Sequence, residues 1–395
     1  MQKMRGLIMP AEYKGLKLGS LFSGSGSFEL AGAMCNVAPV WASEIEKYPI
    51  AITTRRFPNM KHLGDIRGID GGKIEPVDII TFGSPCTDLS LAGNREGLHK
   101  GERSSLFFEA IRIIKEMRSA SAGIYPRIAV WENVTGAFSS HGGEDFRSAL
   151  EAIVRVNHDR ISLPRPEGRW LHAGLIVGYG YSVAWRKLNA IYWGVPQNRE
   201  RIYLVADFRG ERADKILFVE ESQGWDVAAS DSAWKSVPEN PFGCAHGGLV
   251  YSVENYPNDS RVKIREDGTV QTLSAWMGTG GCNVPMVIEL APSYTCGNGQ
   301  ANGSTILLEE HSRTLDCMHD AQTVLHRDNS GKYIIRRLTP LEAVRLQGLP
   351  DWWLDGVKAG DAPKYKLMGN GLALPNAYFV IESIVNLIKK GDPLD

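Results

Sequence analysis

The stretch GLKLGSLFSGSGSF, residues 15–28, joins a short apolar run to a turn of small residues. The run from Gly15 to Phe22 has the length and composition of a buried β-strand. Glycines at positions 24 and 26 let the chain turn sharply and let a ligand approach the main chain before a helix opens at about Phe28. These residues predict the first strand, turn and helix of an α/β fold.

Five more runs have strand-like composition and alternate with helical segments. The predicted strands span Pro39–Ser43, Asp78–Phe82, Ile128–Glu132, Ser182–Leu188 and Arg201–Asp207. Apolar residues at three-and-four spacing predict helices over Ser104–Met117 and Gly143–Val156. Because strands that alternate with helices build a parallel sheet, the sequence predicts a Rossmann-like, doubly wound, mostly parallel α/β fold.

The residue composition of the sequence changes after Asp207. Residues 208–335 are rich in Gly, Asn, Ser and Thr with only brief β-like pieces, which predicts a smaller, irregular, mostly β second domain. The first domain is expected over 1–207. A connecting segment over 336–365 leads to a C-terminal segment over 366–395 that completes the first domain, and its helix Leu374–Lys390 is expected to pack there.

Composition narrows the class of protein. The 395 residues suffice for two domains, and a content of 43% hydrophobic and 23% charged residues is typical of soluble globular proteins. Leu16–Phe22 is too short for a targeting or membrane segment, so a cytoplasmic protein without a membrane partner is expected. Six scattered cysteines favour neither disulfides nor a metal site. Residues 206–335 hold 10 basic and 18 acidic residues, which places basic surface mostly elsewhere in the chain.

Acidic residues follow the glycine turn at spacings that suit an adenosyl ligand. The dinucleotide fingerprint needs a third glycine where Glu29 stands, so a nicotinamide or flavin cofactor loses support. Glu44 lies eighteen residues past Gly26 at the end of a predicted strand, where an acid commonly binds ribose hydroxyls. Asp65, in the segment Gly64-Asp65-Ile66, ends a third run along the chain. Each acid taken alone could equally be a surface residue or a helix cap.

One cysteine directly follows a strand, in the segment Gly83-Ser84-Pro85-Cys86. Pro85 restricts the backbone at its own position and at Ser84, so the chain carries Cys86 off the sheet edge along a defined path. An isolated cysteine is more often a small buried apolar residue. Here Glu132 ends the next strand and is expected at the same edge, so a thiolate and an acid would face one pocket.

Two arginines stand at the start of the last predicted strand. Alternation along an extended chain puts Arg199 and Arg201 on one side. The alternative is a solvated charged turn, the commonest setting for arginine. The apolar lead-in Tyr192–Pro196 favours a buried approach.

The order of these motifs resembles that of the DNA cytosine-5 methyltransferases. The matching segments are Phe22-Ser23-Gly24-x-Gly26, Glu44, Gly64-Asp65, Gly83-Ser84-Pro85-Cys86, Glu132-Asn133-Val134, Gln197-Asn198-Arg199-Glu200-Arg201, Arg337-Leu338-Thr339-Pro340 and Gly369-Asn370. They run from near the first strand to the final helix. The chain departs from the family's usual pattern at Ser84, where Phe is common, and at Thr87, where Gln is common. Thr87 leaves open how the following loop fills the gap left by a flipped base.

The resemblance implies methyl transfer from S-adenosylmethionine to C5 of cytosine in double-stranded DNA, with S-adenosylhomocysteine as product. Cytosine C5 is a poor nucleophile, so the Cys86 thiolate first adds to C6 while Glu132 supplies a proton at N3. By the same resemblance Arg201 holds the cytosine O2. Arg199 assists the thiolate, since a nearby guanidinium lowers the pKa of a thiol.

The resemblance also assigns a cofactor site. Phe22 stacks near the adenine, Glu44 binds the ribose and Asp65 takes the adenine amine. Asn370 lines the methionine end. The other expected cofactor contacts come from Ser23, Gly24, Gly26, Ile66 and Pro85.

The target base must leave the duplex to be reached, and the resemblance indicates how DNA is held. Residues 90–105 have the composition of a lid, with Arg95, Lys100 and Arg103 for phosphates, although a passive basic loop is the alternative. Residues 1–207 correspond to a catalytic and cofactor-binding domain and 208–335 to a target-recognition domain. In the latter, Thr272 and Ser274 are the candidate DNA contacts.

Other classes of protein share parts of this pattern. RNA cytosine-5 methyltransferases of this architecture carry a Cys-Phe-Thr signature that this sequence lacks, and another RNA group has its nucleophile on the Glu132 strand. A catalytically silent DNA-binding relative would more naturally lose Cys86 or Glu132, and Glu29 disfavours a Rossmann oxidoreductase. A cognate restriction endonuclease is one expected functional partner, beside an orphan or phage setting. A monomer is expected, because one flipped base needs one copy.

Overall fold

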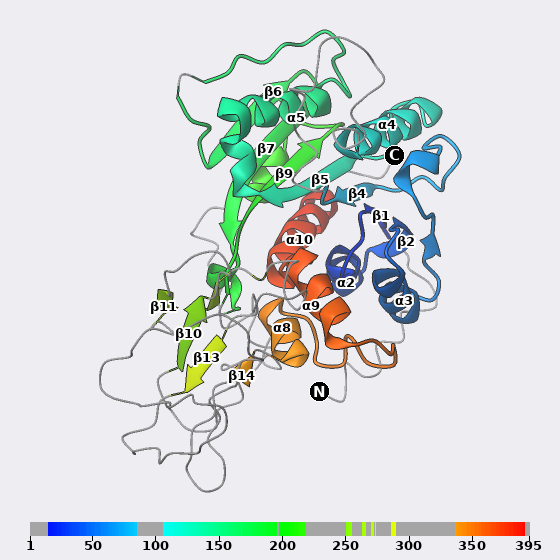
Figure 1. Ribbon diagram of the computed structural model, residues 1–395. Helices are drawn as coiled ribbons and strands as arrows, with labels where there is room; N and C mark the ends of the chain where they lie inside the picture. Colours follow the sequence, from blue (N-terminus) through cyan, green and yellow to red (C-terminus); the bar gives the residue numbers. More distant parts are fainter. Residues whose placement is uncertain are drawn as a thin grey trace, which may run out of the picture.

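The structure is a computed structural model that describes residues 15–84, 106–166, 168–195, 197–218 and 339–391, and also 250–254, 263–265, 270–271, 273, 286–289 and 336–337. An eight-stranded sheet forms its centre, in the order β3-β2-β1-β4-β5-β9-β7-β6 (Figure 1). The strands are β1 Lys17–Leu21, β2 Ala38–Ser43, β3 Lys61–His62, β4 Ile79–Phe82, β5 Ile128–Val134, β6 Ala173–Gly178, β7 Tyr181–Asn189 and β9 Glu200–Asp207. All six strands predicted for the first domain are present.

The sheet is mostly parallel, as predicted. Strands β3, β2, β1, β4 and β5 pair in parallel, so their carboxyl ends meet at one edge. Strand β9 pairs antiparallel with both β5 and β7. The edge strand β6 pairs antiparallel with β7.

The reversed direction of β9 departs from a purely parallel reading of the sequence. Strand β7 ends at Asn189 and β9 begins at Glu200, and this short connection cannot hold the crossover that a parallel neighbour requires. The reversal has a consequence for the edge. The first residues of β9 lie beside the last residues of β5, with Arg201 paired opposite Val134.

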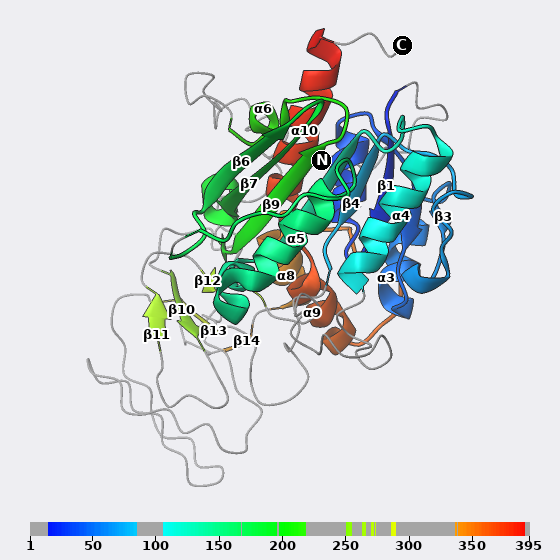
Figure 2. The same cartoon turned by 90° about the horizontal axis from the view of Figure 1, so that it is seen from above.

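Helices cover both faces of the sheet (Figure 2). Ile79 and Val130 face the core formed with α2, α3, α6 and α10, whereas their neighbours Ile80 and Trp131 face the core formed with α4 and α5. This alternation follows from the two-residue period of a strand. The helices are α2 Ser27–Met34, α3 Lys47–Arg56, α4 Leu106–Ala120, α5 Glu144–Val154, α6 Ala213–Leu217 and α10 Leu374–Gly391. The three helices predicted from periodicity are therefore confirmed.

The C-terminal segment returns to the first strands. It begins with α8, Pro340–Leu346, whose N-terminus is closed by a capping box between Thr339 and Glu342. It continues with α9, Asp361–Asn370. Helix α10 then packs against α2 and α6, as expected (Figure 1). Within the described ranges no single helix could cross a membrane, and α9 with α10 passes the length and composition test only as a pair bent by 42°.

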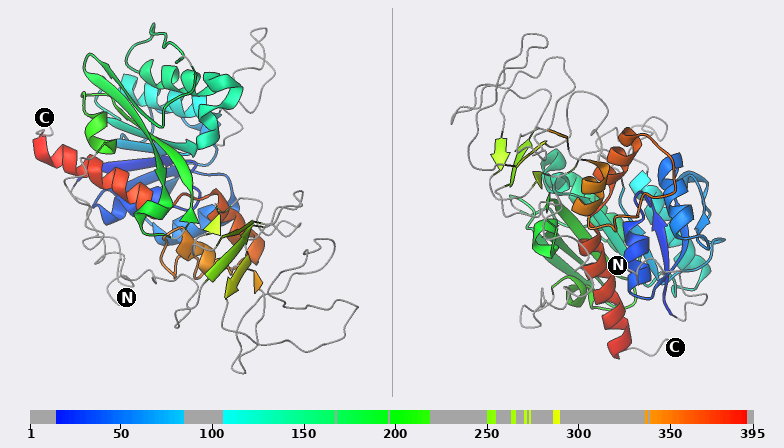
Figure 3. Two further views of the ribbon diagram at one scale, coloured as in Figure 1. Left: turned by 90° about the vertical axis from the view of Figure 1, so that its left-hand side faces the viewer. Right: turned by 90° about the horizontal axis from the view of Figure 1, so that it is seen from below.

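A second, smaller sheet lies to one side of the central sheet (Figure 3). Its strands pair antiparallel in the order β11-β10-β13-β14. A short parallel pairing connects this region to the first domain: Val270 and Gln271 of β12 pair with Gln197 and Asn198 of β8. The strands are β8 Gln197–Asn198, β10 Val250–Glu254, β11 Lys263–Arg265, β12 Val270–Gln271, β13 Met286–Glu289 and β14 Arg336–Arg337.

Candidate active site at the carboxyl edge of the central sheet

The turn after β1 is built from backbone conformations that favour glycine. Gly24 has a φ of 54° and Gly26 a φ of 76°, and Phe22 is also left-handed at 57°. A Cβ at Gly26 would lie 2.8 Å from Thr53 Cγ2, so this position has room for glycine alone. Trp353 Nε1 donates to the Ser25 carbonyl at 2.9 Å. The C-terminal segment thus supports the turn.

Glu44 ties the end of β2 to this turn. Its Oε2 accepts from the Gly24 N–H at 2.9 Å, while its Oε1 accepts from the N–H groups of Ile45 at 2.8 Å and Glu46 at 2.9 Å. A carboxylate offers about four acceptor positions, so these three bonds leave about one position, on Oε2, for a ligand hydroxyl. Glu44 therefore lies where the sequence placed it, beside the glycine turn.

Asp65 and Ile66 follow β3 at the same edge. Asp65 caps a short 3₁₀ helix, Ile66–Gly68, by accepting from the Arg67 N–H at 3.0 Å, and its side chain is half exposed. Ile66 is buried. The Ser43 hydroxyl donates to the Gly64 carbonyl at 2.7 Å, which fixes this segment against the end of β2.

Asn370 reaches the glycine turn from the far end of the chain. It is the last residue of α9, and its side chain is exposed. The next residue, Gly371, packs so closely on the turn that an added Cβ would lie 2.8 Å from Ser25 Oγ. Ser27 Oγ also donates to the Leu372 carbonyl at 3.1 Å. Glu44 and the backbone that follows Asn370 therefore contact the glycine turn, and Asp65 follows β3 at the same edge of the sheet. A backbone cradle with carboxylates at this edge fits an adenosyl ligand.

In the sequence Glu29 stood out only as a departure from the dinucleotide fingerprint, and the burial of its carboxyl group was not predicted. Glu29, in the first turn of α2, is fully buried and accepts a hydrogen bond from Ser23 Oγ. Its Oε2 has no hydrogen-bond partner among the described residues. Burial raises the pKa of this carboxyl to about 7. Its sequence position gave no signal, because acids are common in the first turn of exposed helices.

Glu132 and Arg201 form an ion pair at the edge where β5 ends and β9 begins. Arg201 Nε lies 3.2 Å from Glu132 Oε1, and the side chains are only 14% and 12% exposed respectively. Glu132 is paired opposite Tyr203, so all three side chains share one face. Burial raises the pKa of Glu132, and the charges of Arg201 and Arg199 oppose that rise.

The residue after Glu132 fixes the segment that leads to Cys86. Asn133 Nδ2 donates to the Ser84 carbonyl at 3.1 Å, and Trp131 Nε1 donates to Ser84 Oγ at 3.2 Å. A Cβ added at Gly83 would lie 3.2 Å from Glu132 Oε2. The chain therefore leaves β4 against the Glu132 carboxylate, and Ser84, an apparent departure in sequence, has a hydrogen-bonding role.

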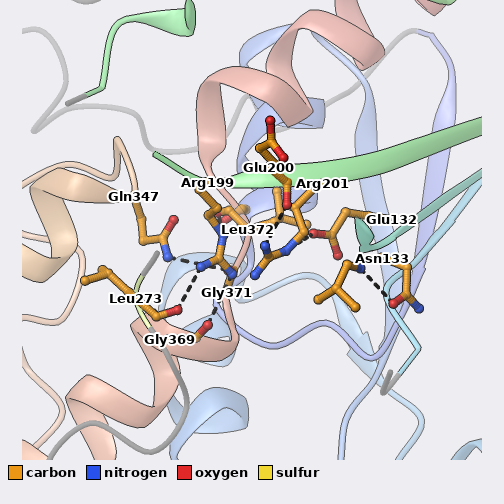
Figure 4. A network of polar contacts seen from close by, with 12 residues as sticks. Glu132, Asn133, Arg199, Glu200, Arg201, Leu273, Gln347, Gly369, Gly371 and Leu372 are labelled. Atoms are coloured by element: carbon orange, nitrogen blue, oxygen red, sulfur yellow. Dashed lines mark hydrogen bonds and ion pairs between the residues drawn. The ribbon is translucent and has the colours of Figure 1, made fainter. Parts of the chain in front are cut away.

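Arg199 lies beside this pair but is held by the backbone (Figure 4). Its Nη1 donates to the Leu273 carbonyl at 3.0 Å, and its Nη2 donates to the carbonyls of Gly369, at 3.1 Å, and Gly371. The side chain is buried, which lowers the pKa of the guanidinium to about 9. Arg199 thus remains charged at neutral pH, and its contacts indicate a positioning role that sequence alone did not suggest.

The structure brings together the residues it describes and leaves other candidates untested. Glu132, Arg199 and Arg201 lie at one end of the shared edge, next to the glycine turn with Glu44 and Asp65. The remaining candidates lie outside the described residues: Pro85, Cys86, Arg95, Lys100, Arg103, Thr272 and Ser274.

A family model for the C-5 cytosine-specific DNA methylases matches residues 16–158 and 176–386. The chain belongs to this family. The match includes both ends of the candidate site, from the glycine turn to α10. It therefore agrees with the resemblance carried by the ordered motifs.

Relatives of this methylase come from bacteria and phages. The type II methyltransferase M.Bsp6I of a Bacillus strain is 26% identical over 93% of this chain and 98% of its own length. The orphan methyltransferase M.SPRI of Bacillus phage SPR is 31% identical over 93% of this chain and 96% of its own. A protein of Escherichia phage P1 named DNA N-6-adenine-methyltransferase is 26% identical over 95% of this chain, which spans only 62% of that relative.

A solved structure has the same fold. The Dnmt2 methyltransferase of S. pombe aligns with 95% of this methylase and 99% of its own chain, at a TM-score of 0.54 and 18% identity. This likeness concerns the fold alone.

Proposed function

We propose that this methylase transfers a methyl group from S-adenosylmethionine to C5 of a flipped-out cytosine in a specific double-stranded DNA sequence. The observation that carries the proposal is the Glu132–Arg201 pair, which lies against the Gly83–Ser84 segment leading to Cys86. Activation of cytosine requires an acid, a cation and a thiol. The acid and the cation lie at this sheet edge, and we propose that the thiol of Cys86 acts beside them.

Each group at this edge has a distinct part in the proposed reaction. The Cys86 thiolate attacks C6 and forms the Cys86–C6 bond. Because burial raises the pKa of Glu132, this carboxyl can carry a proton to N3 and neutralise the adduct. Arg201 holds the cytosine O2 and orients Glu132 through the 3.2 Å contact. Arg199 adds positive charge that lowers the pKa of a thiol nearby.

The glycine turn and its two acids are proposed to bind the methyl donor, whose sulfonium group supplies an electrophilic methyl. Glu44 accepts from the ribose hydroxyls, Asp65 accepts from the adenine amine and Phe22 packs on the ring. Asn370 and the backbone of Ser23, Gly24 and Gly26 contact the methionine end. Ile66 and Pro85 complete the proposed site. After transfer, loss of the C5 proton and elimination of Cys86 release the methylated base and S-adenosylhomocysteine.

The remaining chain is proposed to hold DNA. Residues 1–207 with 366–395 form the catalytic domain, 336–365 connect to it and 208–335 form the target-recognition domain. Arg95, Lys100 and Arg103 contact phosphates, and Thr272 and Ser274 lie at the recognition surface. We further propose a cytoplasmic monomer that acts beside a cognate restriction endonuclease or as an orphan enzyme, and the named relatives support both settings.

The name of the phage P1 relative makes adenine a second candidate target. The exocyclic amine of adenine has its own nitrogen nucleophile, so its methylation needs no covalent activation. The nucleophile and proton donor proposed here, Cys86 and Glu132, would then have no chemical role. Cytosine C5 is therefore the favoured target.

The test is the identity of the labelled product. The purified protein is incubated with methyl-labelled S-adenosylmethionine and unmethylated genomic DNA, and in parallel with RNA, before digestion to nucleosides and mass analysis. The proposal expects labelled 5-methyldeoxycytidine. Label in N6-methyldeoxyadenosine, or in 5-methylcytidine from RNA alone, would contradict it, and Cys86→Ala is the matched inactive control.

A further inference from the structure

Leu273 joins the second region of the chain to the core of the first. Its side chain is 1% exposed and belongs to the same core as α2 and α10. Both of its backbone polar groups are held, since its N–H donates to Gln197 Oε1 at 3.2 Å and its carbonyl accepts from Arg199 Nη1 at 3.0 Å. The preceding residues of β12 pair with β8, which contains Gln197. Leu273 is therefore a fixed anchor between the two candidate DNA contacts at 272 and 274.

The two side chains that hold Leu273 are themselves held by the C-terminal segment. Gln197 Nε2 donates to the Leu346 carbonyl at 2.7 Å, and Arg199 Nη2 donates to Gly369 and Gly371. Gln197 is 0% exposed and Arg199 is 2% exposed. We call Gln197 and Arg199 the clasp, because each contacts Leu273 with one end of its polar group and the C-terminal segment with the other. Figure 4 shows the contacts of Arg199 with Leu273, Gly369 and Gly371.

The clasp is also close in sequence to the proposed catalytic pair, Arg201 and Glu132. Arg199 stands two residues before Arg201, whose Nε contacts Glu132 Oε1 at 3.2 Å. A movement of the backbone at Arg199 is therefore transmitted to Arg201 through one intervening residue. The backbone of Glu200 has little freedom to absorb such a movement, since Glu200 is paired in β9 opposite Asn189.

The Leu273 carbonyl supplies part of the hydrogen bonding that the buried Arg199 guanidinium needs. A buried guanidinium is tolerated where hydrogen bonds compensate for lost hydration, and Arg199 Nε has no hydrogen-bond partner among the described residues. Loss of the Leu273 carbonyl would leave Nη1 unpaired as well. A buried cation with two unsatisfied donors favours rearrangement of the Arg199 side chain, and with it the start of β9.

We propose that Gln197 and Arg199 are positioning residues. They couple the docking of the recognition segment, which we define as β12 together with Leu273, to the placement of Arg201 and Glu132. The inference rests on the proposed function. In this arrangement DNA that seats the recognition segment correctly also aligns the catalytic pair. Recognition would then affect the rate of the chemical step as well as the affinity for DNA.

The test uses two substitutions that remove clasp contacts. Arg199→Lys keeps the charge but cannot reach three carbonyls, and Gln197→Met keeps the length but cannot accept from the Leu273 N–H. The control is Arg186→Lys, because Arg186 Nη1 donates to the carbonyl of Leu217 at 2.8 Å, a hydrogen bond that involves neither Leu273 nor the C-terminal segment. The recognition sequence is first read from wild-type methylation of genomic DNA.

The measured quantities are kcat at saturating DNA and cofactor, KM for the cofactor, and the ratio of kcat/KM between cognate DNA and DNA with one changed base. Both clasp variants should lose at least about tenfold in kcat, corresponding to one buried polar group left without its hydrogen-bond partner. The KM of Gln197→Met for the cofactor should stay unchanged, because Gln197 contacts Leu346 and Leu273 and not the glycine turn. The cognate preference of both clasp variants should fall. Arg186→Lys should retain all three values.

A purely structural role predicts a different result. The clasp variants would then melt at lower temperature but, per folded molecule, keep the wild-type kcat and cognate preference, and this result would overturn the coupling. A wild-type protein that methylates no DNA would contradict the proposed function, and the coupling would fall with it. An active wild type with equally active and selective clasp variants would overturn the coupling alone.

Discussion

The buried carboxyl of Glu29 should make the stability of the protein depend on pH. The group is fully buried, its Oε2 has no hydrogen-bond partner among the described residues, and burial raises its pKa from 4.5 to about 7. Ser23 Oγ donates to Glu29 and partly opposes this rise. The substitution Glu29→Gln keeps the shape of the side chain but removes its ionisation.

The sign follows from proton binding in the two states. The folded protein binds the Glu29 proton more tightly than the unfolded chain, so stability is highest below pH 4.5, falls as pH rises towards about 7 and levels off above. The shift from 4.5 to about 7 corresponds to roughly 3 kcal/mol in the free energy of unfolding. The Glu29→Gln variant should not show this decrease in the free energy of unfolding as pH rises.

The assay is denaturant unfolding of the wild type and the Gln variant at several values between about pH 5 and about pH 8. The stability of the variant relative to the wild type should rise with pH and then reach a plateau. Ser23→Ala removes the hydrogen bond that lowers the pKa of Glu29, so it should extend the decline to higher pH. A difference between wild type and Gln variant that stays constant with pH would refute the reasoning.

Three further predictions concern the proposed site. Glu44→Ala should weaken cofactor binding at least about tenfold, measured by calorimetry, because it removes the acceptor for the ribose and the bond to the Gly24 N–H; unchanged affinity would remove Glu44 from the site. Asn133→Ala releases the Ser84 carbonyl and should lower kcat by about tenfold or more while KM for the cofactor stays constant, and equal kcat would contradict that positioning role. Exchange of residues 208–335 with those of a relative should move the methylated sequence, and an unmoved target would place specificity elsewhere.

Local pattern was sufficient for six of the eight strands of the central sheet, but it did not predict β3, β6 or α3. The apolar runs before Ser23 and Gly83 are strands because both faces of a parallel sheet are covered, and α4, α5 and α10 show the period of amphipathic helices. The positions of Glu44 and Glu132 followed from one rule, since parallel strands end at a common edge. Sequence order was enough to apply that rule.

Features that depend on distant partners could not be predicted. The carbonyl partners of Arg199 come from residues at least 74 positions away, so the sequence showed two arginines separated by one residue but not their different contacts. Gln197 was visible only as part of a motif, although it holds both Leu346 and Leu273. The burial of Glu29 depends on tertiary packing, which a helix-start pattern does not reveal.

The most direct test of the account is covalent trapping on DNA that carries 5-fluorocytosine at the recognition sequence. After methyl transfer, the fluorine at C5 cannot leave as a proton does, so elimination stops and the protein stays bonded to C6. The account predicts a denaturant-stable complex with the nucleotide on Cys86, identified by peptide mass spectrometry and absent in Cys86→Ala. Formation of 5-methyldeoxycytidine on ordinary DNA without such a complex, or attachment at another residue, would contradict it.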